Sequence, residues 1–385
     1  MKRRRSKLVL ISLVATLALG VVINELAFLF PLSPLWLDTD GEARFPATPG
    51  RVRVVMVGDV LLADAAQDVI ADRGYDHVFG ATRQLLQGAD LAVGNLEGPI
   101  CRGGQQQEKR WSYRMDPAAA QALHRAGFGL MNLANNHVLD RGPEGVTETV
   151  AHLRRAGVVP FGAGAREAAA HAPVIRRVRG VTVGFLGYMA PQMTLGGERR
   201  SMAHHCWAPG RAGAACGHAQ RVAQDVAALR RDADVVIVSF HIGDRYQKAP
   251  AGWERQLCQR AIDAGAHAVV NHGTHILGPV ERYRGRPILH GLGNFAFGSG
   301  NVFARFSLAA LLEIDARKKR LLRVQLVPLY TVNRNPWVRF QARALTGWMA
   351  RRVLGRLAEA SATLNAPLVQ GTDPLRVWLE VKETP

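Results

Sequence analysis

The sequence predicts a layered α/β fold that contains two β-sheets. Between residues 51 and 275, short apolar strand patterns alternate with helix patterns, which indicates βα units. From residue 287 to residue 330, strand patterns follow one another with few helices between them. This change favours two packed sheets over one doubly wound sheet. A composition of 48% hydrophobic and 21% charged residues in a chain of 385 is typical of a folded protein.

The N-terminus predicts one transmembrane helix. The basic stretch "MKRRRSK" precedes an apolar segment, Leu8 to Phe30, that carries no charged residue before Glu25. About 20 apolar residues span a bilayer, and basic residues before the span stay in the cytoplasm. The small residues at 18–20 make a weak cleavage site, so we favour an uncleaved signal-anchor over a cleaved signal peptide. The rest of the chain is then expected outside the cytoplasm.

Four segments are expected along the chain. Pro, Gly and Asp are frequent after the apolar segment, which indicates a linker before the first buried strand pattern, "RVRVVMVGDV". The expected segments are a basic stub and membrane span at 1–30, a linker at 31–50, the main domain at 51–335, and a C-terminal helix and strand packed on it at 336–385.

The βα part of the chain is expected to run as follows. Apolar runs predict strands at 51–60, 89–98, 129–136, 158–164, 234–244 and 266–275, with a hairpin at 173–188 that turns near Gly180. Helix patterns lie between them at 81–87, 117–126, 143–156, 217–232 and 252–264. Pro143 suits the first turn of its helix.

The last part of the chain is rich in strands. Strand patterns occupy 287–297, 306–314 and 321–330. Residues 337–357 carry apolar side chains near helical spacing with arginines on the other side, which predicts an amphipathic helix. Such a helix could lie on a membrane surface, but we favour a helix docked on its own domain.

A formal net charge of +18 favours an anionic partner. For an exported protein this partner could be lipid headgroups, a wall polymer or an acidic capsule. We expect no nucleic-acid partner, because the chain carries no nucleic-acid-binding motif and no array of stacking aromatics.

Export also changes what the cysteines predict. Cys206 and Cys216 flank a short loop and form the pair most suited to a disulfide, with free buried thiols as the alternative. No C-x-x-C pair supports a zinc site built from cysteines.

Polar side chains recur where successive predicted strands end. Groups of this kind gather beyond the carboxyl ends of strands in α/β folds. Each alone could be a turn residue, but carboxylates, amide oxygens and imidazoles together are the ligands of Zn, Mn or Fe. In chain order they are Asp59; Asn95 and Glu97; Asn135, Asn136, His137 and Asp140; His241 and Asp244; His272 and His275; and His290 and Asn294.

These strand ends lie in motifs that resemble the CapA family of capsule and poly-γ-glutamate biosynthesis proteins. In order, the motifs are "GDVLLA", "GNLEGPI", "LANNHVLDRG", "SFHIGDRY", "NHGTHILGPVERYRGRPIL" and "GLGNFAF", and the resemblance runs from about residue 52 to residue 330. The family has a fold related to calcineurin-like metallophosphatases. The resemblance therefore implies a layered α/β/β/α sandwich, preceded here by the transmembrane helix, in a protein of the bacterial cell membrane.

The resemblance also implies a role for each strand-end residue. Catalytic roles go to His137, as acid or electrostatic stabiliser, and to Asn95, which stands where the metallophosphatases have a bridging Asp. Substrate contacts go to Asn135, Arg141, Asp244, Arg245 and Asn294. The implied ligands of one or two divalent ions (Zn, Mn or Fe) are Asp59, Glu97, Asn136, His241, His272 and His275.

Three departures from the metallophosphatase pattern bear on the number of ions. The first motif has Leu61 where those enzymes have a His, "NHGTH" lacks the middle His of their "GHHPH", and Arg245 stands in place of an acidic residue. Asp244 could substitute for that acid. One of the two ions is therefore in doubt.

Three functions follow as hypotheses. The first is a membrane-anchored protein that acts in biosynthesis or export of poly-γ-glutamate or a capsule, with a metal-dependent hydrolase- or transferase-like site for a phosphoester or amide. The second is a non-catalytic subunit that binds the anionic polymer for a membrane synthase complex. The third is a metal-dependent phosphoesterase. Fold alone does not determine which of these functions applies. A test of metal dependence separates the second hypothesis from the other two, because only those two require a metal ion.

Overall fold

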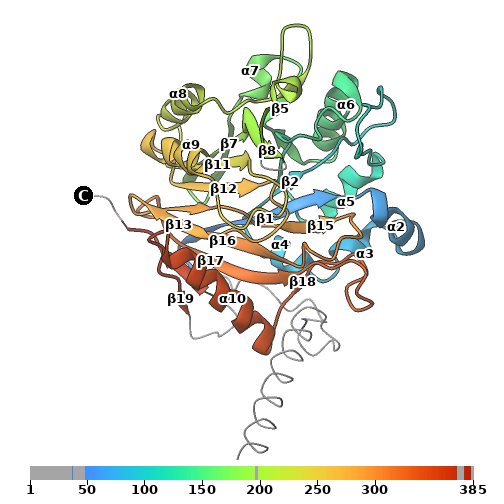
Figure 1. The fold of residues 1–385 in the computed structure, drawn as a ribbon. Helices are drawn as coiled ribbons and strands as arrows, with labels where there is room; N and C mark the ends of the chain where they lie inside the picture. The colour runs from blue at the N-terminus through green and yellow to red at the C-terminus, as the bar shows by residue number, and fades with distance from the viewer. Residues whose placement is uncertain (1–36, 38–47, 196–197, 371–376, 383–385) are drawn as a thin grey trace, which may run out of the picture.

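Two β-sheets pack face to face in the computed structural model, which describes residue 37 and residues 48–195, 198–370 and 377–382 (Figure 1). The predicted transmembrane segment lies outside the described residues. None of the helices in the described ranges is long and apolar enough to cross a membrane.

The larger sheet has ten strands and contains the first and the last strand of the described chain. Its order is β19-β20-β17-β16-β1-β2-β3-β4, with β15 paired to β1 and β18 paired to β17. β1 to β4 run parallel, whereas β16 and β17 are antiparallel to their neighbours. The strands are β1 (Arg51–Leu61), β2 (Leu91–Leu96), β3 (Leu130–Asn132), β4 (Val159–Phe161), β15 (Asn294–Phe297), β16 (Phe306–Asp315), β17 (Arg320–Tyr330), β18 (Arg343–Ala344), β19 (Val369–Gln370) and β20 (Val377–Glu380).

The second sheet has six strands in the order β13-β14-β12-β11-β7-β6. Its central strands β14, β12, β11 and β7 are parallel. The strands are β6 (Val174–Val178), β7 (Val181–Met189), β11 (Val235–His241), β12 (Ala268–His272), β13 (Val280–Tyr283) and β14 (Arg286–Leu289). Two small sheets pair β5 (Ala163–Gly164) with β10 (Gly213–Ala214) and β8 (Gln192–Leu195) with β9 (Glu198–Ser201).

Helices cover the outer faces of both sheets. α3 to α6 pack on the larger sheet, and α8 and α9 pack on the smaller one (Figure 1). The helices are α2 (Gln67–Arg73), α3 (Tyr75–Phe79), α4 (Arg83–Gln87), α5 (Ala118–Ala126), α6 (Gly142–Arg155), α7 (Glu167–Ala170), α8 (Ala219–Leu229), α9 (Gly252–Asp263) and α10 (Gly347–Ala362), with 3-10 turns η2 (Asp64–Ala66) and η3 (Ala203–His205). The four-layer α/β/β/α arrangement expected for this chain is therefore present.

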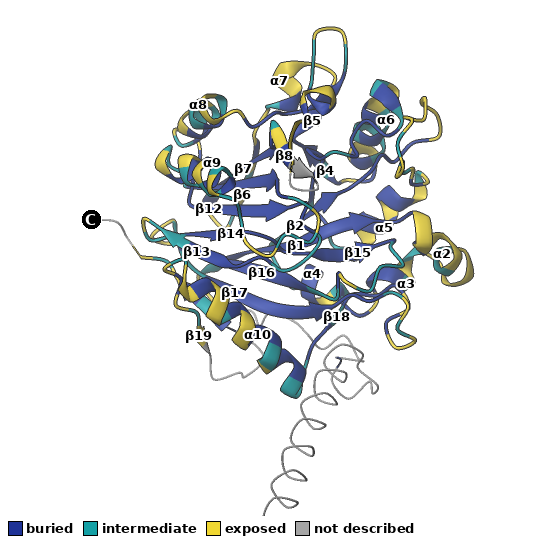
Figure 2. Cartoon of the chain, in the orientation of Figure 1, coloured by how far each residue is buried: buried dark blue, intermediate teal, exposed yellow. Residues whose placement is uncertain are grey.

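The apolar runs of the sequence are explained by burial on both faces of the sheets. Along β1, Val54 and Met56 enter the core between the two sheets, whereas Val55 and Val57 enter the core under the helices. Phe185 of β7 packs from the other sheet into the first of these cores. A strand covered on both sides needs apolar residues at every position, and the sheets are accordingly the most buried part of the molecule (Figure 2).

The structure differs from the sequence prediction at four places. The single strand expected at 287–297 is two strands, β14 in the smaller sheet and β15 in the larger one, because the chain crosses from one sheet to the other between them. The strand expected at 129–136 ends at Asn132, so the polar residues after it lie in a turn. The short helices α2 and α3 lie in a stretch where no element was expected. The helix expected from residue 337 begins only at Gly347, because Arg339 and Phe340 have φ values of 42° and 67°, which no α-helix accommodates.

α10 docks on its own domain rather than lying free. It packs against β13 and β17, and its buried face includes Met349, Val353 and Leu357. Leu37 joins the same apolar cluster and forms a β-bridge with Leu345, just before the helix.

The expected disulfide between Cys206 and Cys216 is present, while Cys101 and Cys258 are free and buried. The disulfide closes the loop that follows β9. We expect the Cys206→Ser/Cys216→Ser variant to have a free energy of unfolding about 2–3 kcal/mol lower, since the cross-link restricts the unfolded chain. Denaturant unfolding with and without reductant tests this. Reductant should shift the unfolding midpoint of the parent chain and leave that of the variant unchanged; equal midpoints for all samples would contradict the expectation.

Candidate metal centre at the strand ends

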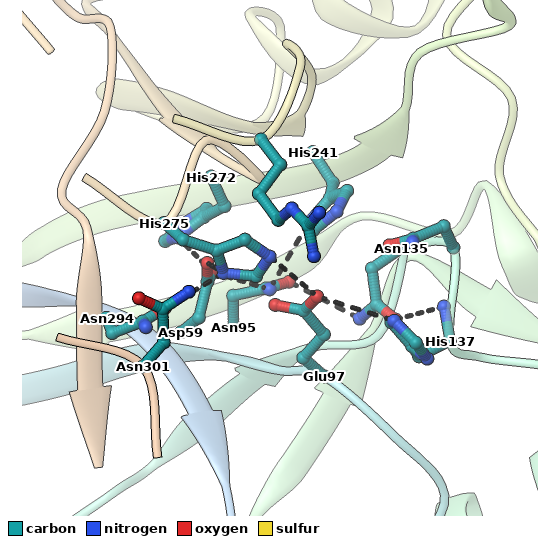
Figure 3. A network of polar contacts seen from close by, with 12 residues as sticks. Asp59, Asn95, Glu97, Asn135, His137, His241, His272, His275, Asn294 and Asn301 are labelled. Carbon is teal, nitrogen blue, oxygen red and sulfur yellow. Dashed lines mark hydrogen bonds and ion pairs between the residues drawn. The ribbon is translucent and has the colours of Figure 1, made fainter. Parts of the chain in front are cut away.

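The carboxyl ends of four strands bring the polar residues together. In the larger sheet Asp59 of β1 lies opposite Asn95 of β2, and in the smaller sheet His241 of β11 lies opposite His272 of β12. Because the two sheets face each other, these pairs meet in one cluster (Figure 3). The predicted grouping of Asp59, Asn95, Glu97, Asn135, His137, His241, His272, His275 and Asn294 around one point is seen in the close-up view.

A close backbone approach holds β15 against the end of β1. The Asp59 amide donates to the Gly293 carbonyl at 3.0 Å. A Cβ atom on Gly58 would lie 1.8 Å from that carbonyl oxygen, so no larger residue fits without moving the backbone. Glycine at position 58 therefore allows Asn294 to stand beside Asp59 in the sheet register.

Asp59 is the hub of the cluster and is fully buried. Asn95 Nδ2 donates to its Oδ1 at 2.9 Å. His272 Nδ1 lies 3.3 Å from Oδ1, and His275 Nδ1 lies 3.3 Å from Oδ2. Burial alone would raise the pKa of Asp59, but its contacts with His272 and His275 hold that pKa well below its usual value. Asp59 is therefore a carboxylate at neutral pH.

Glu97 is also fully buried, and neither of its carboxyl oxygens has a hydrogen-bond partner among the described residues. Its Oε1 lies 3.6 Å from His275 Nε2 and 3.8 Å from His137 Nε2. Burial, aided by the negative charge of Asp59, raises the pKa of Glu97 well above its usual value. The positive charge of the nearby His275 offsets part of this effect, because it favours the ionised carboxylate.

His275 lies between the two carboxylates. Its Nδ1 donates to Asn294 Oδ1 at 2.9 Å, and only 16% of its side-chain surface is exposed to solvent. Burial lowers the pKa of His275, but the charges of Glu97 and Asp59 outweigh that effect and raise it to about 9. The imidazole is therefore protonated at neutral pH in the absence of metal.

These three side chains fit a divalent metal ion. Ligand atoms of Asp59, Glu97 and His275 all lie within 4.8 Å of one another. Asp59 Oδ2 and both oxygens of Glu97 are buried without a hydrogen bond from the described residues. Unpaired buried charge is costly, and a bound cation removes that cost. Two carboxylates and an imidazole suit Zn, Mn or Fe.

The remaining predicted ligands offer further donor atoms. Burial lowers the pKa of His241 to about 3, so its ring is neutral and able to bind metal. His272 Nδ1 is buried and forms no hydrogen bond with the described residues. The same is true of the side-chain oxygen of Asn136, whose backbone oxygen accepts from Lys109 Nζ at 2.9 Å. Their roles as ligands remain predictions.

His137 forms a separate pair with Asp140 beside the carboxylates. Its Nδ1 lies 2.8 Å from Asp140 Oδ2, and Tyr113 packs on its ring at 4.5 Å between centroids. Burial lowers the pKa of His137, and the hydrogen bond to Asp140 offsets part of this effect. Lys109 forms an ion pair with Asp140. The contact between His137 and Asp140 fixes the imidazole ring so that its Nε2 faces Glu97.

The amides of the cluster are engaged in hydrogen bonds with one another. Asn95 Oδ1 accepts from Asn132 Nδ2 at 3.1 Å and Asn135 Nδ2 at 3.5 Å. Asn135 also donates to the Leu96 carbonyl at 2.8 Å and accepts from the His137 amide at 3.1 Å. In this arrangement both side chains position the residues beside them, and a direct contact with substrate remains a prediction.

The other residues predicted to contact substrate interact with neighbouring loops in the structure. Arg141 donates to the Tyr113 carbonyl and to Gln106 Oε1. Arg245 is exposed and stacks over Trp111 at 4.7 Å. Asp244 accepts a hydrogen bond from the amide of Arg245. His290, at another strand end, pairs with Glu281 at 2.8 Å and so belongs to a different network.

Sequence reasoning missed three members of the site. Lys109 and Tyr113 lie in the loop before α5, where no pattern singles them out. Asn132 is the last residue of the buried strand β3, and its place at a strand end could have marked it. Asp140 was noted at a strand end but received no role.

Metal binding should strengthen as the pH rises. His275 has a pKa of about 9 without metal, so it must lose a proton before it can bind an ion. The apparent affinity is expected to rise about tenfold per pH unit for each proton released, one from His275 and a second from any Glu97 that is still protonated, because the pKa of Glu97 is raised as well. Calorimetric titration with Mn²⁺, in buffers of different ionisation enthalpy, measures both the affinity and the protons released. Binding that is independent of pH would contradict a ligand role for His275.

Fold and site together define a two-sheet α/β protein with a buried carboxylate–histidine centre. Residues 53–299 match the family described as "Bacterial capsule synthesis protein PGA_cap". The chain belongs to this family of bacterial capsule synthesis proteins.

Individual relatives are similar over most of the same region. The PGA biosynthesis protein CapA of Bacillus subtilis is 28% identical over 276 residues, covering 71% of this chain and 70% of the relative. A probable polyglutamine synthesis accessory protein of Mycobacterium tuberculosis is 35% identical over 256 residues, covering 62% of this chain and 66% of the relative. Among solved structures, a novel phosphatase from Mycoplasma pneumoniae is similar over 73% of this chain and 94% of its own, at 12% sequence identity and a TM-score of 0.45.

Proposed function

We propose that this protein is a membrane-anchored CapA-like protein that acts in biosynthesis or export of an anionic surface polymer, poly-γ-glutamate or a capsule. Its strand-end cluster acts as a metal-dependent hydrolase- or transferase-like site on a phosphoester or amide bond. One observation carries the catalytic part: two fully buried carboxylates, Asp59 and Glu97, hold oxygens that no described residue hydrogen-bonds. Family membership supports the polymer.

In this proposal Asp59, Glu97 and His275 would hold one divalent ion, and Asn136, His241 and His272 would offer further donor atoms beside it. A bound ion with an open position would lower the pKa of a water molecule and polarise a phosphoryl or carbonyl oxygen. Asn95 holds Asp59 in place through its 2.9 Å hydrogen bond.

His137 supplies the general acid of the same site. It donates a proton from Nε2 to the leaving group, while Asp140 holds Nδ1 and stabilises the charged ring.

The proposed cellular location depends on the apolar segment near the N-terminus and on the domain that follows it. The apolar segment at 8–30 anchors the protein in the bacterial cell membrane, with the two-sheet domain on the extracytoplasmic side. Membrane synthase subunits are the partners that such a position offers.

A second candidate is a non-catalytic subunit that binds the polymer for a synthase. The net charge of +18 favours it, because a basic protein attracts a polyanion without any metal. The third candidate, a metal-dependent phosphoesterase, uses the same centre on phosphoesters alone and has no role in the surface polymer.

One assay separates these functions. The purified chain is supplied with Mn²⁺ or Zn²⁺ and incubated with poly-γ-glutamate, whose length is followed by size exclusion, and in parallel with a phosphodiester. Metal-dependent shortening of the polymer that Asp59→Asn abolishes supports the amide reaction, and cleavage of the phosphodiester alone supports the phosphoesterase. Polymer binding without turnover, equal in both chains, would overturn catalysis and leave the binding subunit.

A further inference from the structure

A hollow of about 400 Å³ lies beside α10, outside the strand-end cluster. One wall is α10 itself, and the others are the segments 276–279 and 303–306. Its floor is apolar and includes Leu277, Phe306, Val353 and Leu357. The volume is within the range of about 300–1,000 Å³ that small-ligand sites occupy.

The walls of this hollow carry positive charge. Lys248, Arg305 and Arg356 line it, and none of its lining residues is acidic. An apolar floor with cations at the rim is complementary to a molecule that has both a hydrocarbon part and an anionic group. A soluble polyanion would not need the apolar floor, and a neutral lipid would not need the cations.

The hollow lies on the side of the domain that the N-terminal chain reaches. Leu37 is buried in the cluster that contains Val353, and its β-bridge partner Leu345 directly precedes α10. Leu37 follows Phe30, the end of the apolar segment, by seven residues. Seven extended residues span at most about 25 Å, at about 3.3–3.6 Å each. An anchor that ends at Phe30 therefore keeps α10 close to the bilayer surface.

The exposed surface around the hollow suits that position. Phe303 lines its rim and is 70% exposed, the largest exposed fraction of the large apolar side chains in the described part of the chain. Arg351 and Arg356 of α10 are both exposed, and Arg356 also lines the hollow. Exposed aromatic and basic residues together are typical of surfaces that meet anionic membrane lipids.

We propose that this hollow binds one anionic phospholipid of the membrane in which the protein is anchored. An acyl chain lies against Leu277, Phe306 and Val353, and the phosphate lies near Lys248, Arg305 and Arg356. The proposal rests on the membrane anchoring proposed above but does not require the metal centre. Ile276 of the hollow directly follows His275, so the hollow and the strand-end cluster adjoin along the chain.

Native mass spectrometry of the full chain in detergent tests this. The chain is titrated with phosphatidylglycerol or with phosphatidylcholine. We expect about tenfold tighter binding of phosphatidylglycerol at one site, the preference that a few surface cations confer. Two variants should lose that one adduct: Lys248→Glu/Arg356→Glu, which reverses the charge, and Ala360→Trp, which fills the hollow from its exposed rim.

The matched control is Arg231→Glu/Lys318→Glu, which reverses two exposed cations that do not line the hollow. It should keep the phosphatidylglycerol adduct. Metal content, measured on every sample, should not change in any of these variants. If a hollow variant loses the lipid adduct but keeps its metal, the loss is due to the hollow alone. If the chain contains no metal but keeps the adduct, only the proposed function is contradicted.

Two outcomes would overturn the lipid proposal. One is equal binding of the two lipids, or an adduct that survives in both hollow variants. The other is a cross-link from a photoreactive residue at position 303 to residues 26–36, because the chain itself would then cover the hollow.

Discussion

Replacing Asp59 by asparagine is expected to weaken binding of Mn²⁺ or Zn²⁺ by more than about 100-fold, because outer-shell changes alone already cost about 10- to 100-fold. Asn keeps the shape of the side chain but removes the charge that the contacts with His272 and His275 maintain. It also removes an oxygen that forms no hydrogen bond with the described residues. Calorimetric titration of the two purified chains measures the change.

The matched control is Asp225→Asn. Asp225 also accepts from a histidine, His171 at 3.0 Å, but it lies on α8, outside the cluster. This variant should bind metal like the parent chain. Equal affinities for the parent and Asp59→Asn chains would show that Asp59 is not a ligand.

Replacing His137 by alanine is expected to lower turnover by about 10²- to 10⁴-fold, the usual contribution of a general acid. Metal affinity should change little, because the ring nitrogens face Asp140 and Glu97 from the side of the cluster. The measurement is kcat on the substrate found in the polymer and phosphodiester assay, with metal content determined on the same sample.

A companion variant separates chemistry from folding. Asp140→Asn keeps the ring of His137 but removes the charge that stabilises its protonated form, so turnover should fall while metal stays bound. His152→Ala, on α6, removes a histidine outside the cluster and should leave turnover unchanged. Full turnover in His137→Ala would exclude it as the acid.

The composition of the site was largely predictable because polar side chains stand near the carboxyl ends of buried, mainly apolar strands. Asp59, Asn95, His241 and His272 lie within the last three residues of β1, β2, β11 and β12, so each marks a position near the edge of its sheet. Parallel strands bring such ends to one side. The cysteine pair was predictable for a similar reason, since a short loop keeps its two ends close.

Other features depend on tertiary packing that no local pattern encodes. Lys109 contacts the His137 turn only because the loop before α5 folds back over it. The helix expected from residue 337 is interrupted because apolar residues such as Val338 and Phe340 are buried in irregular backbone, where periodicity suggests a helix. α2 and α3 are too short for helical periodicity to stand out.

The central claim is that the strand-end cluster is a metal centre, and anomalous X-ray scattering from crystals of the parent chain tests it most directly. Crystals grown with Mn²⁺, Zn²⁺ or Fe²⁺ are measured on either side of the absorption edge of the metal. We expect one anomalous peak within about 2.0–2.2 Å of carboxylate oxygens of Asp59 and Glu97 and a ring nitrogen of His275. No peak at these residues with any of the three ions would contradict the metal centre and leave the cluster as buried polar structure.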